Sequence, residues 1–195
     1  MNLGVLVSGE GTNLQALIDA GIPIAVVIAN KPDAHALVRA ARAGIAHEVV
    51  EHRGLERIAF EDRMLAVLAQ HRVEAVVLAG FMRVLTPHFV DHFPGRLINT
   101  HPSLLPAFPG ADAVAQALAH GVKLAGVTVH FVDHSLDGGP IIAQAAVPVR
   151  DDDTESTLAA RVLAEEHRLL PQAIRWFAEG RLVIAGGRVR VTGEP

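Results

Sequence analysis

The 195-residue chain is 50% hydrophobic, 4% aromatic and 19% charged, so aliphatic side chains must fill a sizeable core and large-scale disorder is not expected. Its formal net charge of −4 lacks the basic surplus of nucleic-acid-binding proteins, and we expect no nucleic-acid partner. The absence of cysteine excludes disulfides, thiolate nucleophiles and cysteine-ligated metal sites.

The length of the chain favours one domain over residues 1–195. Residues 1–9 carry no secretory signal, and no segment approaches the roughly 18 apolar residues of a membrane-spanning helix. We therefore expect a cytoplasmic protein that does not associate with membranes. The sequence leaves open whether it is a monomer or a homodimer.

Short β-branched runs alternate with Ala/Leu-rich amphipathic runs in the first half. The expected strands are Leu3–Val7, Pro23–Ile28, Glu48–Val50, Ala75–Leu78 and Leu97–Ile98. The expected helices are Asn13–Ala20, Ala34–Ala43, Leu55–Gln70 and Pro87–His92. This alternation predicts an α/β fold with a doubly wound, mostly parallel sheet that helices cover on both faces.

The second half predicts antiparallel strands appended to that sheet. Val127–Val132 and Ile141–Val149 are strand candidates joined by the short loop "DHSLDGGP". A long helix is expected from about Thr154 to Glu179, since acidic residues precede it. A hairpin of Leu182–Ala185 and Arg188–Thr192 closes the chain.

A glycine-rich turn, Ser8 to Asn13 in "VLVSGEGTNLQALID", separates the first strand from the first helix. Free N–H groups at a helix N-terminus suit an anion. The dinucleotide fingerprint fails because Leu14 replaces its third glycine, and no acidic residue follows the second strand. The lysine of a P-loop is absent too. We expect a phosphomonoester site, with an ordinary β–α turn capped by Thr12 as the alternative.

Asn99 and His101 follow a strand in "RLINTHPSLLPAFPG". Because they are two residues apart on extended backbone, they point to the same face. Pro102 favours extended geometry at His101, and three prolines would hold the loop beyond it rigid. The carboxyl ends of parallel strands border the ligand crevice of such folds. We expect a catalytic pair there; the alternative is a capping Asn and a hydrogen-bonded surface His.

Asp137, in the glycine-hinged "LDGGP" loop, is the candidate partner of His101, although it is also typical of a turn aspartate. Two other arrangements are disfavoured. His130 and His134 would lie about 13 Å apart along a strand, too far to share a metal ion. A hydrolase triad through Ser103 lacks the strained turn that presents a nucleophilic serine.

Five segments, taken together, resemble the phosphoribosylglycinamide formyltransferase (glycinamide ribonucleotide transformylase) family, the folate-dependent formyltransferases of purine synthesis. They are "VLVSGEGTNLQALID", "VVLAGFMRVLTPHFV", "RLINTHPSLLPAFPG", "VHFVDHSLDGGPIIAQ" and "EEHRLLPQAIRWFAEGRL". Thr12 stands where serine is common in the family. Ala111, Asp112 and Val114 replace residues that are histidines in many members.

The resemblance implies transfer of a formyl group from the co-substrate 10-formyltetrahydrofolate to the amine of glycinamide ribonucleotide, without a metal. It implies a phosphate-binding half, 1–94, and a catalytic and folate-binding half, 95–195, and admits a cis Leu105–Pro106 bond. The implied catalytic residues are Asn99, His101 and Asp137. The implied substrate-binding residues are Gly11, Thr12, Asn13 and Glu166. The implied folate-binding residues are Arg57, Met82, Arg83, Val84, Leu85, Asn99, His134 and Asp137, with His134–Gly139 as the folate loop. A formyltetrahydrofolate hydrolase and a non-catalytic folate sensor remain alternatives.

Overall fold

The computed structural model describes residues 1–193 and divides them into two compact units, Met1–Asn99 and the part from Thr100 onward. Strand β5 (Leu97–His101) runs from the first unit into the second. The predicted assignment of phosphate binding to one half and of catalysis and folate binding to the other, within one domain, stays a prediction.

The first unit contains five parallel strands in the order β3-β2-β1-β4-β5. Besides β5 they are β1 (Leu3–Val7), β2 (Ile24–Ala29), β3 (His47–Val49) and β4 (Ala75–Leu78). All residues of β1 and β4 are buried. Burial on both faces explains why these strands are continuous aliphatic runs without polar alternation.

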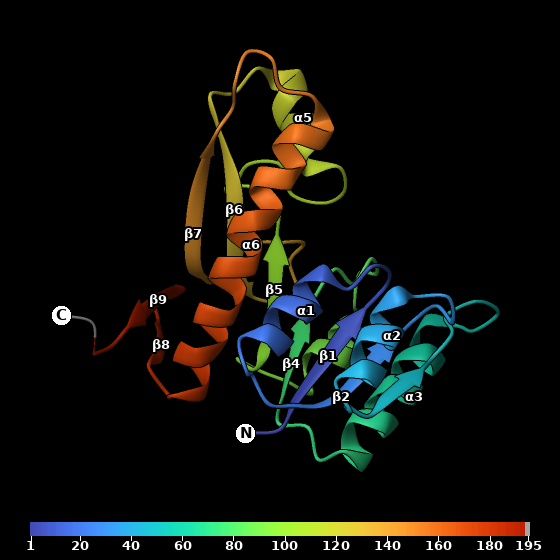
Figure 1. The fold of residues 1–195 in the computed structure, drawn as a ribbon. Coiled ribbons are helices and arrows are strands. Elements are labelled where there is room, and N and C mark those ends of the chain that lie inside the picture. The colour runs from blue at the N-terminus through green and yellow to red at the C-terminus, as the bar shows by residue number, and fades with distance from the viewer. Residues whose placement is uncertain (194–195) are drawn as a thin grey trace. The chain divides into compact units, whose positions relative to one another are not determined.

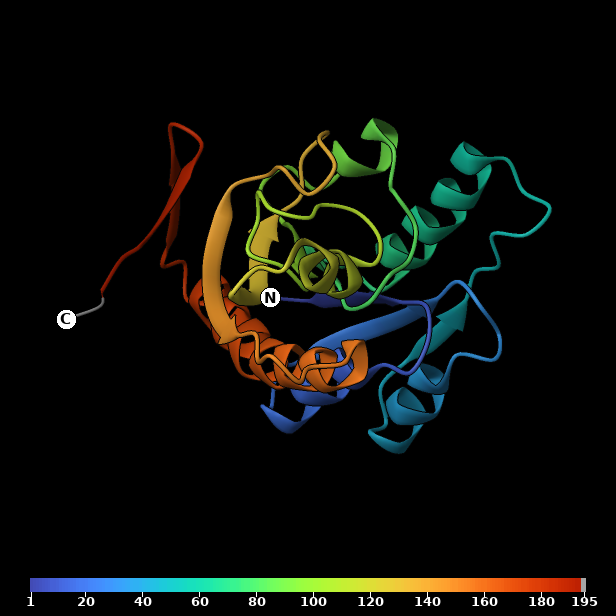
Figure 2. The same ribbon diagram turned by 90° about the horizontal axis from the view of Figure 1, so that it is seen from above.

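Helices cover both faces of this parallel sheet (Figure 2). They are α1 (Thr12–Asp19), α2 (His35–Arg42), α3 (Arg57–Gln70) and α4 (Pro87–Val90). Figure 1 shows α1 and α2 beside β1 and β2, and α1 packs against α2 as α3 packs against α4. The helices follow the strands along the chain, so the turns that lead into them lie at the carboxyl ends of the parallel strands.

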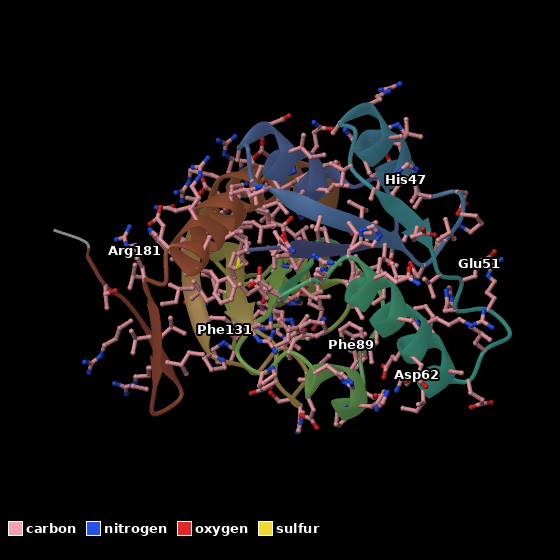
Figure 3. The ribbon with its side chains drawn as sticks, turned by 90° about the horizontal axis from the view of Figure 1, so that it is seen from below. His47, Glu51, Asp62, Phe89, Phe131 and Arg181 are labelled. Carbon is pink, nitrogen blue, oxygen red and sulfur yellow. The ribbon has the colours of Figure 1, made fainter. Side chains whose placement is uncertain are left out.

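Strand β3 forms the outer edge of this sheet and is its least protected element. It has three residues, all of them exposed, and it pairs only with β2 among the described strands. His47 and the nearby Glu51 are both exposed, and Figure 3 labels them at this end of the sheet. The edge is therefore short and polar, apart from Val49.

The second unit contains an antiparallel pair, β6 (Leu124–Phe131) and β7 (Ile141–Pro148), with Val127 opposite Ala145. The long helix α6 (Glu155–Ala178) packs against both strands (Figure 1), and α5 (Ala113–His120) packs against α6. A separate hairpin, β8 (Leu182–Ala185) and β9 (Arg188–Val191), follows α6. Among the described residues, no helix is long and apolar enough to cross a membrane.

The complete strand order, β3-β2-β1-β4-β5-β6-β7, confirms the predicted mostly parallel sheet with antiparallel strands in the C-terminal half. Several local predictions were inaccurate. Strand β6 begins at Leu124 instead of Val127, and helix α3 begins at Arg57 instead of Leu55. Strand β5 continues through polar residues to His101 instead of ending at Ile98. Helix α5 was not predicted, because Gly110 and Asp112 precede it with left-handed backbone and no side chain caps it. Helix α4 ends at Val90, two residues early.

Candidate active site

His101 and Asp137 lie close together inside the second unit. The Nδ1 atom of His101 is 3.5 Å from Oδ2 of Asp137, and their side chains are only 7% and 12% exposed. The Nε2 atom of His101 is 2.8 Å from the Phe108 carbonyl, to which it donates. Both ring nitrogens thus face oxygen acceptors, and both are satisfied when the ring is doubly protonated.

The carboxylate of Asp137 is held by the loop on the other side of His101. Its Oδ2 accepts the Gly110 N–H at 2.8 Å, which ties the Asp137 loop to the end of the proline-rich segment. Asp137 itself has φ +52°, a conformation that Asp tolerates better than most residues. This geometry fixes the carboxylate instead of leaving it on a mobile hinge.

Gly139 explains the double glycine that follows Asp137. A Cβ atom at position 139 would lie 2.0 Å from the Phe131 carbonyl oxygen, so only glycine allows the loop to approach β6 this closely. The Phe131 N–H then donates to the Pro140 carbonyl at 2.9 Å. The start of β7 is thereby locked to the end of β6, and Asp137 is presented beside His101.

His130 is a site residue that the sequence prediction missed. It lies buried in β6 with Nε2 3.8 Å from Oδ1 of Asp137, so the carboxylate stands between two imidazoles. Burial lowers the pKa of His130, although the Phe131 carbonyl and the charge of Asp137 act in the opposite direction. Nδ1 donates to the Phe131 carbonyl at 2.9 Å and therefore carries a proton. A His that ends an apolar strand just before the Asp137 loop was the available signal.

A buried hydroxyl holds the proline-rich loop. Thr128 Oγ1 donates to the Ser103 carbonyl at 2.7 Å and accepts from the Leu105 N–H at 3.0 Å. Gln144 donates to the same hydroxyl and to the Leu105 carbonyl, both at 2.9 Å. The Leu105–Pro106 peptide bond is cis, as the resemblance allows. Side-chain hydrogen bonds therefore reinforce the loop beyond the stiffness of its prolines.

Two further predicted site residues are Asn99, which is part of β5, and Glu166, which lies on α6. Asn99 is half-buried and lies two residues before His101 on the same strand. Glu166, on α6, is 7% exposed, and its Oε1 accepts a hydrogen bond from Thr100 at 3.2 Å. Glu166 was indicated by the family resemblance alone. The sequence could not specify its partner, which is Thr100, between Asn99 and His101.

The glycine-rich turn of the first unit is shaped by α2. Gly11 has φ +70°, and a Cβ there would lie 2.6 Å from the Cβ of Ala36. The Ala36 N–H donates to the Gly9 carbonyl at 3.1 Å, and Arg39 Nε donates to the Glu10 carbonyl at 2.8 Å. Gly11 is the N-cap of α1 and Thr12 is its first residue, so the alternative of a Thr12 cap is wrong.

The residues predicted to bind folate are mostly exposed. In the first unit, Arg57 begins α3, and the segment from Met82 to Leu85 follows β4 with Met82 75% and Val84 57% exposed. His134, in the second unit, is exposed as well. Within residues 1–193, no cluster of three or more His, Asp or Glu side chains could hold a metal ion.

Comparison with known proteins identifies the family. A family model described as "Formyl transferase" matches residues 1–174. The phosphoribosylglycinamide formyltransferase of Escherichia coli K12 is 47% identical over 189 residues, covering 93% of this chain and 89% of the relative. The enzyme of that name from Haemophilus influenzae is 42% identical, covering 92% and 88%. A crystal structure of glycinamide ribonucleotide transformylase 1 from Symbiobacterium toebii superposes with a TM-score of 0.97 at 50% identity, covering 99% and 94%.

The chain belongs to the formyl transferase family. Two of these relatives are named phosphoribosylglycinamide formyltransferase and the third glycinamide ribonucleotide transformylase, and these names confirm the resemblance seen in the five sequence segments.

Proposed function

We propose that this chain transfers a formyl group from 10-formyltetrahydrofolate to the primary amine of glycinamide ribonucleotide, a step of purine synthesis. The observation that carries the proposal is the pairing of His101 with the enclosed carboxylate of Asp137, in a chain that is 47% identical to the Escherichia coli enzyme of this name. Similarity at this level favours transfer over the hydrolase and sensor alternatives, because the Escherichia coli relative is named as a transferase.

Direct attack by the neutral amine on the formyl carbon forms a tetrahedral oxyanion. The Asn99 amide donates to that oxygen, and protonated His101 stabilises the same charge. One such preorganised donor typically lowers the barrier by about 3 kcal/mol. A formyl oxygen that approaches Nε2 of His101 must compete with the Phe108 carbonyl, which lies 2.8 Å from that nitrogen.

Asp137 orients His101 and balances its positive charge. The Asp137 carboxylate is itself held by the Gly110 N–H, so the His101 ring is set by a fixed acceptor. The proton leaving the attacking amine passes to the folate nitrogen with the help of this pair. The oxyanion then collapses to the new formamide as the bond between the formyl carbon and the folate nitrogen breaks, and tetrahydrofolate leaves. His130, kept neutral by burial, lines the other side of the carboxylate without adding a competing positive charge.

The two substrates are assigned to separate groups of residues. Gly11, Thr12 and Asn13 at the N-terminus of α1 supply backbone N–H donors for the substrate phosphate. Glu166 accepts from the substrate amine or ribose. Folate contacts Arg57, the segment from Met82 to Leu85, His134 and the Asp137 loop. These residues include exposed apolar side chains beside charged ones, a combination that suits a flat ring with an acidic tail.

An absorbance assay of folate deformylation, run with and without glycinamide ribonucleotide, tests the proposal. We expect product folate to appear only when the ribonucleotide is present. Release of product without it would indicate a hydrolase. Tight folate binding with no turnover under either condition would indicate a sensor.

A further inference from the structure

Glu61 is a buried carboxylate that the proposed chemistry does not use. It lies on α3 and is only 1% exposed. Its Oε1 accepts the Thr86 N–H at 2.8 Å, and its Oε2 accepts the Thr86 hydroxyl at 2.5 Å. Both donors are neutral and both belong to one residue, so this carboxylate is committed to fixing the position of Thr86.

Packing alone does not account for an acid at this position. Burying a carboxylate against neutral donors is costly, and an apolar side chain of similar volume is often as stabilising or more so. Thr86 is the N-cap residue of α4, and its side chain makes no capping hydrogen bond, whereas its hydroxyl donates to Glu61. This hydrogen bond joins α3 to the start of α4.

The segment before Thr86 is fixed at its other end by Ser8. The Met82 N–H donates to the Ser8 hydroxyl at 2.8 Å, and Ser8 is 4% exposed. Between these two anchors, Met82 and Val84 hold their side chains in solvent, 75% and 57% exposed. Large apolar side chains on a short segment with both ends fixed to buried polar groups are preorganised to receive a ligand.

We infer that Glu61 is a positioning residue for folate. Through Thr86 it fixes the end of the segment from Met82 to Leu85, and the inference rests on the proposed function, which assigns this segment to folate. The ligand class is that of the proposed co-substrate, a flat, partly apolar ring system that packs on Met82 and Val84. Figure 3 shows the pairing of elements that makes this possible: α3, marked by Asp62, lies beside α4, marked by the buried Phe89.

The test compares Thr86→Val with Thr86→Ser in the full chain. Valine keeps the size of the side chain but removes the hydroxyl that donates to Oε2 of Glu61, and it leaves the backbone N–H that donates to Oε1. Serine keeps both donors. We expect Thr86→Val to weaken tetrahydrofolate binding in calorimetry about tenfold and to raise the KM for formyltetrahydrofolate equally, because a charged acceptor loses its hydrogen bond. The KM for glycinamide ribonucleotide should change less than twofold, and Thr86→Ser should match the wild type within about twofold.

Asp62→Asn is the matched control, since this neighbouring carboxylate also joins α3 to α4, through His88 at 2.7 Å, but does so in solvent. It should leave folate binding unchanged. If Thr86→Val lowers thermal stability but binds tetrahydrofolate like the wild type, Glu61 is merely structural and the inference is wrong. If Thr86→Val fails to fold, Glu61→Gln replaces it: its amide can keep both contacts, so loss of folate binding there would contradict a geometric role and retention would support it. A wild-type protein that binds no tetrahydrofolate would overturn the proposed function itself.

Discussion

The His101 imidazole is held from both sides by two loops that are joined to each other by a hydrogen bond. The Phe108 carbonyl takes one nitrogen, and Asp137, itself bound to Gly110, faces the other. A ring held in this way has little freedom to turn, which is what a group that stabilises a short-lived charge requires.

We predict that His101→Ala and Asp137→Asn each lower kcat by about 10²–10⁴-fold while the KM values change little, because both residues act on the reacting centre. If the two residues act as a unit, the double variant should be scarcely slower than either single one. Steady-state rates of the four proteins measure this. His47→Ala, which replaces an exposed histidine on β3, is the control and should keep full activity. Additive losses would show that the residues act independently.

The residues of this site differ in how far the sequence could specify them. Asn99 and His101 were indicated by their place at the end of a strand, whereas Asp137 was a candidate partner that is also typical of a turn aspartate, and the family resemblance implied all three. Their mutual distances were not indicated, since Asp137 is brought to His101 by a loop bound to Gly110, a backbone contact with no side-chain signature. His130 was set aside because its spacing to His134 argued against a metal, and a negative argument about metal says nothing of its contact with Asp137.

Helix α2 contacts the glycine-rich turn and restricts its conformation. Ala36 leaves no room for a Cβ on Gly11, so Gly11→Val would disturb folding as well as phosphate binding. Arg39 offers a cleaner variant, because its guanidinium reaches the Glu10 carbonyl from outside the turn. We predict that Arg39→Gln raises the KM for glycinamide ribonucleotide about tenfold with kcat nearly unchanged.

Arg42→Gln is the control for that experiment, because it removes the same charge from an exposed position one turn later on α2. Equal effects of the two variants would mean that overall charge, and not the contact with Glu10, governs binding of the anionic substrate.

The start of α6 is held by an ion pair that also shapes its stability in acid. Asp153 is bound by Arg161 and by the Arg150 N–H and Thr157 hydroxyl, and these contacts hold the pKa of Asp153 well below its usual value, with the Arg161 bonds contributing most. A folded-state pKa below the unfolded value of about 3.8 means that the contribution is present above pH 4 and is lost as the pH falls below it.

We therefore predict that Asp153→Asn lowers the melting temperature at pH 7 and that this difference shrinks as the pH is lowered below about 4. Thermal unfolding at several pH values measures it. Asp151→Asn, whose partner Lys123 is 81% exposed, is the control and should have almost no effect. A difference that persisted at the lowest pH would exclude the ion pair as its cause.

The proline-rich loop gives a further prediction. Since Thr128 and Gln144 already pin Ser103 and Leu105, Pro102→Ala should cost only about 0.4–1 kcal/mol of stability, through the unfolded chain. We expect kcat to fall clearly all the same, because His101 directly precedes the proline and about 1 Å of misplacement can cost on the order of a hundredfold. Melting curves and rates on one preparation decide it, and a variant with full kcat would assign the proline to stability alone.

The sequence predicts an element well when the residues of that element alone determine it. Strands β1 and β4 were placed to the residue because both faces are buried and every position is aliphatic. Strand β5 was cut short because its last residues serve the site and are polar. Helix α6 runs through Pro171, a residue that commonly ends a helix, because its many buried side chains outweigh one lost backbone bond. Packing of this kind is invisible until the partner strands are placed.

For the whole molecule, the dependence of stability on pH should carry the signature of His130. Its pKa is lowered in the folded state, chiefly by burial, so the unfolded chain binds the proton more readily. The free energy of unfolding is therefore not reduced by His130 above about pH 6.5, and it falls as the pH drops below that value. We predict that the loss of stability between pH 7 and pH 5 is smaller in His130→Gln than in the wild type.

Urea unfolding at both pH values measures this difference. In the variant, Asp137 loses its neighbour His130 but keeps its contacts with His101 and Gly110. Parallel slopes in the two proteins would contradict the prediction. The overall fold class was predictable because the alternation of strands and helices fixes a parallel sheet, whereas this buried histidine required the structure.

The short polar edge strand β3 has a consequence for the behaviour of the protein at high concentration. An open sheet edge offers unpaired N–H and C=O groups to any other extended chain and is a common starting point for aggregation. Here only three residues are available, and Glu48 would be brought against its own copy in an edge-to-edge pairing. Such a ladder would be short and would juxtapose like charges, so this end of the sheet resists growth into fibrils. Replacing Glu48 by an aliphatic residue should remove that protection and make the protein more prone to form β-rich aggregates.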